Sequence, residues 1–225
     1  MVEPPAPALL ADEILAANSA AWREMQAHRF IRDIEADQLD PTVFHRYLAY
    51  EGAFVATAIA IFAEAVAKAP GIEEQRWLID VLKALADDQI GYFEATFQQL
   101  GLDPDEAPRH PSVDAFCIGM RQIAAEGSYL DIVTAMFCAE WMYWTWCRRA
   151  ARRTITDPIL KRWVKMHAEE EFADQARWLK AQLDTTGRHL PRDARRRLSQ
   201  LFGRVLRMEI DFHSAPYDPG DDDRQ

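Results

Sequence analysis

Three glutamates lie in strongly apolar stretches of this 225-residue sequence, where an ionised side chain is hard to accommodate. Glu140 is the clearest case, because it is the one carboxylate in the segment MFCAEWMYWTWC, residues 136–147. Residues three and four positions apart share one face of a helix. Around Glu140 these positions hold Met136, Phe137, Tyr143 and Trp144. Because a buried carboxylate must be paired, protonated or put to chemical use, we expect Glu140 to point inward as a candidate acid–base group.

Glu51 and Glu209 occupy similar settings, and the same argument applies to both. Their neighbours at three and four positions include Tyr47, Leu48, Phe54 and Val55 for the first glutamate, and Val205, Leu206 and Phe212 for the second. The alternative for any single helical acid is the solvated face, where most such acids lie. The consecutive acids Glu169, Glu170 and Glu171 are expected to be solvated in this way.

A histidine and several aromatic residues complete the set of candidate groups. His167 has Trp163 four residues before it and Glu171 four residues after it, which predicts a structural imidazole bonded to a carboxylate. The aromatic residues near Glu140 are expected to pack mostly in the core. Aromatic walls combined with a few acids also describe a pocket for a flat heterocycle.

Seven long segments with helical periodicity must position these residues. They span residues 11–30, 38–70, 72–101, 112–127, 128–152, 156–184 and 191–216. Start signals are Asp40-Pro41 and Asp157-Pro158, while Gly101 is a stop signal. No run of residues reads as a strand. We therefore predict an all-α, single-domain helical bundle of about seven helices over residues 1–225, with a frayed acidic tail at 215–225.

The composition limits the classes of function. A net charge of −10 argues against a nucleic-acid-binding protein, which normally presents a basic face. The N-terminus lacks a secretory signal, and no stretch of about 18 uninterrupted apolar residues occurs. The three cysteines have no framework spacing, which suggests reduced thiols. We expect a cytoplasmic protein with a small heterocyclic substrate and with no membrane or nucleic-acid partner.

Four stretches of the chain resemble the TenA family (thiaminase II, aminopyrimidine aminohydrolase). They span residues 22–55, 135–144, 162–184 and 204–217, and include AMFCAEWMYW and RVLRMEIDFHSAPY in the family's order and spacing. The resemblance implies the haem-oxygenase-like all-helical fold and a homo-oligomer, either a tetramer or a dimer. It also implies hydrolysis of aminomethyl-pyrimidines, or cleavage of thiamin, in thiamin salvage. No cofactor is expected.

The resemblance carries substrate-binding residues onto this chain, with several departures. The family's aspartate that holds the aminopyrimidine falls on Glu51, so the charge is kept and one methylene is added. Three of the family's pocket tyrosines fall on Phe54, Phe116 and His167. These departures fall on substrate-binding positions, so they bear on the identity of the substrate and not on the fold.

The resemblance also points to a site without a catalytic cysteine. The family's nucleophilic cysteine falls on Ala139, and Cys138 is one residue, or about 100° of helix, away from that position. One TenA subgroup carries a glutamate in an E-x-x-Y pattern instead, and Glu140 with Tyr143 matches it. The family's C-terminal glutamate matches Glu209.

These matches imply roles for the three glutamates. Glu209 would protonate the leaving amine or thiazole as a general acid. Glu140 would act as a general base on water or as a paired acid, because two close carboxylates in a dry pocket split their pKa values. Glu51 would accept hydrogen bonds from the amidine edge of the ring. Tyr143 and His167 would line the substrate pocket, and no metal is required.

Two other functions are consistent with the sequence. A di-metal oxidase of the same fold would use six residues at suitable spacing: Asp87, Glu94, Glu140, His167, Glu171 and Asp174. Such an oxygen-rich site would favour manganese or magnesium, because only one of the six ligands is a histidine. The third possibility is a non-catalytic, ligand-binding or regulatory TenA-like protein, which the loss of pocket tyrosines would permit.

Overall fold

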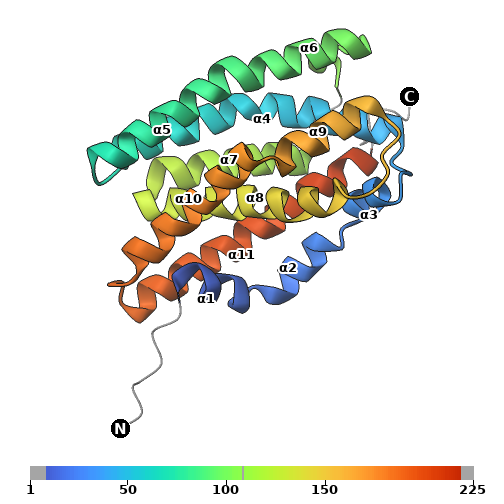
Figure 1. Ribbon diagram of the computed structural model, residues 1–225. Helices are drawn as coiled ribbons and strands as arrows, with labels where there is room; N and C mark the ends of the chain where they lie inside the picture. Colours follow the sequence, from blue (N-terminus) through green and yellow to red (C-terminus); the bar gives the residue numbers. More distant parts are fainter. Residues whose placement is uncertain (1–8, 108, 219–225) are drawn as a thin grey trace.

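The computed structural model describes residues 9–107 and 109–218, and these residues fold almost entirely into helices (Figure 1). The α-helices are α1 (Leu10–Ala17), α2 (Ser19–Gln26), α3 (Arg29–Glu35), α4 (Pro41–Lys68), α5 (Ile72–Ala84), α6 (Ile90–Leu100), α7 (Pro111–Glu126), α8 (Tyr129–Ala150), α9 (Pro158–Ala168), α10 (Glu170–Gly187) and α11 (Arg192–Ser214). Short helical segments are η1 (Leu85–Gln89), η2 (Pro104–Glu106) and η3 (Ala215–Tyr217). No strand occurs in the described ranges, so the predicted all-α class is confirmed.

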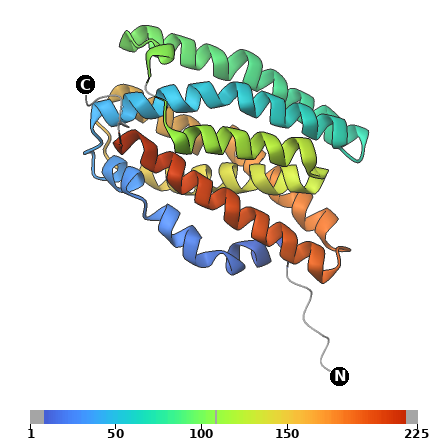
Figure 2. The same ribbon diagram turned by 180° about the vertical axis from the view of Figure 1, so that it is seen from behind.

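Helix α8 lies at the centre of the bundle. It packs against α7, α9, α10 and α11 and also contacts α3 and α4. Helices α5 and α6 follow the outer side of α4, whereas α1 and α2 lie along α11 on the opposite side of the bundle (Figures 1 and 2). Every residue of α8 from Asp131 to Ala139 is buried, because nearly all of them are apolar. Glu140 therefore follows directly on a stretch that other helices enclose.

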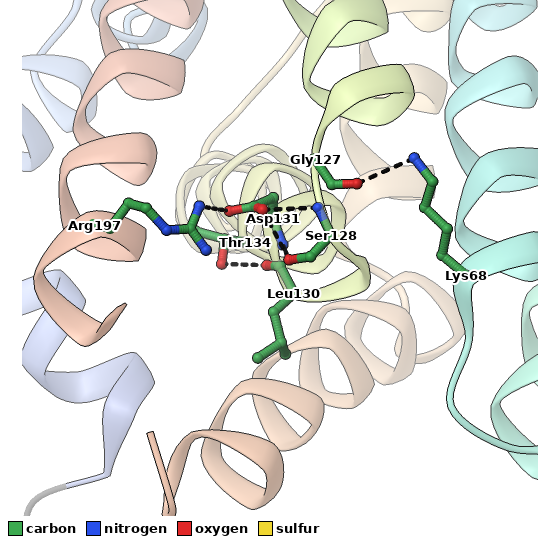
Figure 3. A network of polar contacts seen from close by, with 7 residues as sticks. All are labelled: Lys68, Gly127, Ser128, Leu130, Asp131, Thr134 and Arg197. Atoms are coloured by element: carbon green, nitrogen blue, oxygen red, sulfur yellow. Dashed lines mark hydrogen bonds and ion pairs between the residues drawn. The ribbon is translucent and has the colours of Figure 1, made fainter. Parts of the chain in front are cut away.

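Polar contacts at the start of α8 fix it against α4 and α11 (Figure 3). Ser128 and Asp131 form a capping box, in which the Ser128 backbone N–H donates to Asp131 Oδ2 at 2.8 Å. Arg197 of α11 forms an ion pair with Asp131. Lys68, the last residue of α4, donates to the carbonyl oxygen of Gly127 at 3.1 Å. The predicted helix start at Ser128 is therefore confirmed, and its cap also connects neighbouring helices.

The first predicted helix, residues 11–30, is wrong in one respect, because the structure divides it into α1, α2 and the start of α3. Asn18 lies at the first break, and its side-chain amide donates to the carbonyl oxygens of Ile14 at 2.9 Å and Ser199 at 3.0 Å. The second break follows Ala27, where His28 accepts a hydrogen bond from the backbone N–H of Phe30 and caps α3. The bond to Ser199 on α11 crosses the fold, so the local sequence could not indicate it.

Two further predicted helices are interrupted. The segment 72–101 passes through the π-helical turn η1 between α5 and α6. The segment 156–184 breaks at Glu169, whose extended backbone (φ −72°, ψ 164°) separates α9 from α10. The break at Glu169 has no glycine or proline beside it, and η1 contains neither residue, although Gly91 follows two residues after it. Single π-helical turns within helices often lie at functional sites, and both interruptions border one pocket.

The predicted frayed tail begins too early. Residues Ala215–Tyr217 form the short helix η3, and Ala215 is 1% exposed. The Tyr217 hydroxyl donates to Asp33 Oδ2 at 2.6 Å, which attaches this segment to α3. Residues 219–225 of the predicted tail lie outside the described residues.

Helix α4 is the one helix in the described part of the chain that is long and apolar enough to cross a membrane. Half of its most apolar window is buried inside the fold. Glu51, in the middle of this helix, is also buried. This burial against other helices is typical of the core helix of a bundle.

Candidate active site

The seven residues predicted for the site surround one internal cavity of about 70 Å³, which is enough for several water molecules. They come from five helices: Glu51 and Phe54 of α4, Phe116 of α7, Glu140 and Tyr143 of α8, His167 of α9 and Glu209 of α11. Ala139, the position of the family's cysteine in the sequence comparison, also lines the cavity. The structure thus brings the predicted residues together, and their chemical roles stay predictions.

A tryptophan on a different helix, α9, fixes the carboxyl group of Glu51. Its Oε2 accepts a hydrogen bond of 2.6 Å from the indole Nε1 of Trp163 on α9. The other oxygen, Oε1, lies 3.6 Å from Nε2 of His167. Because one oxygen is occupied by a fixed donor, the carboxyl group has a defined orientation with respect to the cavity.

Glu140 and Glu209 differ in the donors that reach them. Glu140 Oε1 accepts a hydrogen bond of 2.9 Å from the side-chain amide of Gln175 on α10. Glu140 keeps some solvent exposure as a residue, but its Oε2 is buried without a hydrogen-bond partner. Glu209 is 1% exposed, and its Oε2 has no hydrogen-bond partner among the described residues either, with Nδ1 of His213 3.7 Å away. These two oxygens can accept hydrogen bonds from a ligand.

Burial raises the pKa of all three carboxyl groups. Desolvation is the largest cause each time and raises the pKa of Glu51, Glu140 and Glu209 from 4.5 to about 8. For Glu209 the negative charges of the other two glutamates act in the same direction. Hydrogen bonds from Trp163 and Gln175 lower the pKa of Glu51 and Glu140 in part. Glu209 is therefore the carboxyl group whose ionised form is least supported.

The neighbouring histidines are neutral near pH 7. His167 Nδ1 lies 2.9 Å from the carbonyl oxygen of Trp163, and a carbonyl only accepts, so Nδ1 carries the proton. Desolvation lowers the pKa of His167 to about 4 and that of His213, behind Glu209, to about 3. The predicted pairing of His167 with Glu171 is wrong, because Glu171 is exposed and the imidazole faces Glu51 instead. Neither imidazole supplies a positive charge to the carboxyl groups.

Aromatic rings form the remaining walls. The ring centroids of Phe54 and Phe116 lie 4.8 Å apart, and Phe116 lies 5.1 Å from Phe212. The hydroxyl group of Tyr143, which also lines the cavity, shares a hydrogen bond of 2.6 Å with that of Tyr47. The phenyl rings therefore offer flat apolar surface without hydroxyl groups, and the Tyr143 hydroxyl is already bonded to Tyr47.

Sequence reasoning missed the donors that orient the carboxyl groups. Trp163 and Gln175 lie on α9 and α10, far in sequence from the glutamates that they contact. No sequence pattern marks such a pair, because it depends on how separate helices pack. Cys138 is fully buried, its Sγ lies 3.6 Å from the carbonyl oxygen of Phe202, and it is not among the residues that line the cavity.

The six residues of the alternative di-metal site do not converge. Asp87, Glu94 and Asp174 are exposed, and Asp174 is paired with Arg177 at 2.7 Å. In residues 9–107 and 109–218, no group of three or more histidine, cysteine, aspartate or glutamate side chains is arranged to hold a metal ion. The spacing in the sequence therefore does not produce the six-ligand arrangement.

Comparison with known proteins places this chain among helical relatives. A family model described as the TENA/THI-4/PQQC family matches residues 15–218. An aminopyrimidine aminohydrolase from Halalkalibacterium halodurans is 22% identical over 201 residues, which are 87% of this chain and 90% of that protein.

Solved structures show the same fold at low sequence identity. A TenA homologue from Pyrococcus furiosus is 19% identical and superposes with a TM-score of 0.86, covering 93% of this chain and all of that one. A domain of unknown function from Shewanella denitrificans, described as having a heme oxygenase-like fold, is 10% identical with a TM-score of 0.72, covering 92% and 91%. The predicted haem-oxygenase-like fold is thereby confirmed.

Proposed function

This chain belongs to the TENA/THI-4/PQQC family, and we propose that it is a hydrolase that cleaves a C–N bond of an aminopyrimidine or thiamin-related compound. The observation that carries the proposal is the convergence of Glu51, Glu140 and Glu209 on one largely apolar cavity. The aminohydrolase activity named for the Halalkalibacterium halodurans relative supports it. A role in thiamin salvage and a homo-oligomeric state follow from the family resemblance and stay predictions, as does the cytoplasmic location expected from the composition.

We assign ring binding to Glu51 and the phenyl groups. Glu51 Oε2 is occupied by Trp163 at 2.6 Å, so Oε1 is the oxygen that would accept a hydrogen bond from the amidine edge of the ring. Phe54 and Phe116 would contact the face of the ring, since their centroids lie 4.8 Å apart along the same wall. This arrangement selects a flat heterocycle with donors on one edge.

Glu209 and Glu140 divide the proton transfers. Glu209 has no donor for its Oε2 and is surrounded by other carboxyl groups, so it is the group most easily kept protonated. It would give its proton to the leaving amine as the C–N bond breaks. Glu140, whose ionised form is favoured by the Gln175 hydrogen bond, would accept the proton of the attacking water. The products are an alcohol and ammonia, and proton exchange with solvent restores both groups.

The test is a substrate screen with product identification. The purified protein is incubated with an aminomethyl-pyrimidine and, separately, with thiamin, and the alcohol and ammonia or thiazole are quantified. We expect turnover of at least one compound, reduced by about 100-fold or more in Glu209→Gln, because that variant cannot supply a proton. The exposed Glu94 on α6 provides the matched control, Glu94→Gln.

Two results would contradict the proposal. If the Glu209→Gln variant retains full turnover, the assignment of the general acid is wrong. If the compounds bind tightly but neither is hydrolysed, the protein is a ligand-binding member of the family instead, as the departures at Phe54, Phe116 and Ala139 would allow.

A further inference from the structure

An outer pocket adjoins the cavity and leads to solvent. It has a volume of about 260 Å³ and is bordered by η1 and by the break between α9 and α10. The two spaces share the lining residues Leu85, Gln89, Glu140, His167 and Phe172. We call the outer pocket and the cavity together the access route, because they connect exposed residues with the three buried carboxyl groups.

All charged residues along the access route are acidic. The outer pocket adds Asp88, Glu169 and Glu171 to the three glutamates of the cavity. No lysine or arginine is among the described residues that line either space. Glu169 is paired with Lys165 at 3.3 Å on the exposed surface. Asp88 and Glu171 are exposed and form no ion pair with another residue of the described ranges, so their negative charge is not balanced by a neighbour.

The interior end of the route independently points to a ligand that donates hydrogen bonds. Glu209 is 1% exposed, lines the cavity and has an unpartnered Oε2. Glu140 Oε2 is also buried and unpartnered. Unsatisfied buried acceptors are rare in folded proteins because each lost hydrogen bond is unfavourable. A cationic amine would donate a hydrogen bond to each of the two oxygens and would stabilise the ionised form of Glu140.

We propose that the access route selects its ligand by charge, admitting a ring that carries a cationic aminomethyl group and excluding the same ring when it carries a phosphate ester. The choice of ring rests on the proposed function, whereas the charge selection rests on the acids of the route. Hydrolysis consumes R–CH₂–NH₃⁺ and water and yields R–CH₂–OH and NH₄⁺. The cationic group is thereby lost from the ring, so the neutral alcohol binds more weakly than the substrate and leaves the site.

The amino end of helix α10 would attract anions, but acidic residues beside it offset this attraction. Helix α10 begins at Glu170, and the amino end of a helix carries a partial positive charge that attracts anions. Glu169, Glu170 and Glu171 occupy its cap and first turn. Glu169 and Glu170 are paired with Lys165 and Arg177, so Glu171 is the acid of this group whose charge no ion pair in the described ranges offsets. Its full negative charge outweighs the roughly half positive charge of a helix end, so a phosphate ester meets net repulsion where the outer pocket opens to solvent.

The test measures binding, not turnover, with ligands that differ only in charge. The probes are an aminomethyl-pyrimidine, its hydroxymethyl counterpart and the phosphate ester of the latter, together with benzylamine, benzyl alcohol and benzyl phosphate. Quenching of tryptophan fluorescence reports binding, because Trp163 contacts Glu51 of the cavity. In Glu209→Gln the hydrolysis is slowed about 100-fold or more, which allows the aminomethyl compound to be titrated, while the benzyl compounds are titrated with the unchanged protein.

Charge selection predicts an order of affinity of amine, then alcohol, with no saturable binding of the phosphate ester. We call the exposed Asp88 and Glu171 the mouth of the access route. The double variant Asp88→Asn plus Glu171→Gln removes the charge of both. It should slow association of the amines about three- to ten-fold at low salt and little at high salt, because salt screens the attraction. The matched control neutralises two exposed acids outside the route, Glu106→Gln plus Asp211→Asn. It should leave the association rate unchanged.

Each outcome separates the charge selection from the proposed function. Binding of a phosphate ester as tightly as its amine, in either series, overturns the charge selection. So does an association rate that the mouth variant leaves unchanged at low salt, and so does a complete lack of binding by both amines. If the benzyl series shows the predicted order but the pyrimidines bind no better than benzyl compounds and are not hydrolysed, the charge selection holds and the proposed function fails.

Discussion

Replacing Glu209 by glutamine should stabilise the protein above pH 8 while abolishing its proposed activity. Between pH 4.5 and 8 the folded state binds the proton of the Glu209 carboxyl group more tightly than the unfolded chain does, because burial raises the pKa of Glu209 from 4.5 to about 8. Stability therefore falls as pH rises through this window, since the unfolded state binds fewer protons. Glutamine has nearly the same shape and stays neutral, so the variant loses this pH dependence.

The size of the effect follows from the same values. The difference between about 8 and 4.5, at about 1.4 kcal/mol per pH unit, gives about 5 kcal/mol as an upper limit at pH 9. Part of this shift comes from the charges of Glu140 and Glu51, which also titrate, and water in the cavity screens the charge. We therefore expect the variant to be about 2 to 4 kcal/mol more stable at pH 9, and within about 1 kcal/mol of the parent at pH 5.

The assay is urea unfolding at pH 5, 7 and 9, followed by tryptophan fluorescence, with the midpoint and slope fitted at each pH. Glu94→Gln on the exposed face of α6 is the control, and its stability should follow the parent at every pH. The reasoning is refuted if Glu209→Gln is no more stable than the parent at pH 9, because the buried carboxylate would then carry no desolvation penalty.

Three further perturbations test individual parts of the site. Glu140→Gln should reduce turnover about 100-fold or more. Cys138→Ala should change turnover less than about two-fold, because Cys138 is buried outside the cavity lining. Equal losses of turnover in both variants would contradict the assignment of the reactive group to a carboxylate. Gln175→Leu removes the donor to Glu140 and should move the acidic limb of the pH–rate profile to higher pH, and an unmoved limb would show that this bond does not support the ionised form. The affinity for benzylamine should rise between pH 6 and pH 8, and binding in this range should release protons, because the cation favours the ionised form of Glu140, whose pKa is about 8. Calorimetry in buffers of different ionisation enthalpy measures the proton release, and proton uptake would contradict the prediction.

Helix starts could be predicted because their signals are local. Asp40 and Asp157 accept hydrogen bonds from backbone N–H groups one or two residues into the helix, and each precedes a proline at the first helical position. Gly101 adopts the left-handed conformation (φ 65°) that ends α6. Such signals involve neighbours in the chain, so a single sequence contains them.

The interruptions within helices could not be predicted because their causes lie elsewhere in the fold. Asn18 ends α1 through a bond to Ser199, which is 181 residues away. The break at Glu169 follows a smooth helical pattern in the sequence, with no glycine or proline. Helix propensity is a weak preference that tertiary contacts override.

The candidate site shows the same division. The apolar neighbours of Glu140 predicted an inward carboxyl group, and its Oε2 is buried. The family resemblance then selected residues on five helices, which periodicity alone does not connect. The sequence did not indicate which of Glu140 and Glu209 accepts a stabilising hydrogen bond, because the donor Gln175 belongs to a separate helix. Glu171 was likewise expected on the surface, where it lies, but not beside the cavity.

The pH dependence of ammonia release from an aminomethyl-pyrimidine tests the central claim most directly. A site that needs one ionised and one protonated carboxyl group gives a bell-shaped profile of kcat, with limbs on either side of about pH 8, because the two coupled groups titrate in separate steps around that value. Glu140→Gln should remove the acidic limb from the residual rate, and Glu209→Gln the alkaline limb. A profile that keeps both limbs in both variants would show that other groups carry the chemistry.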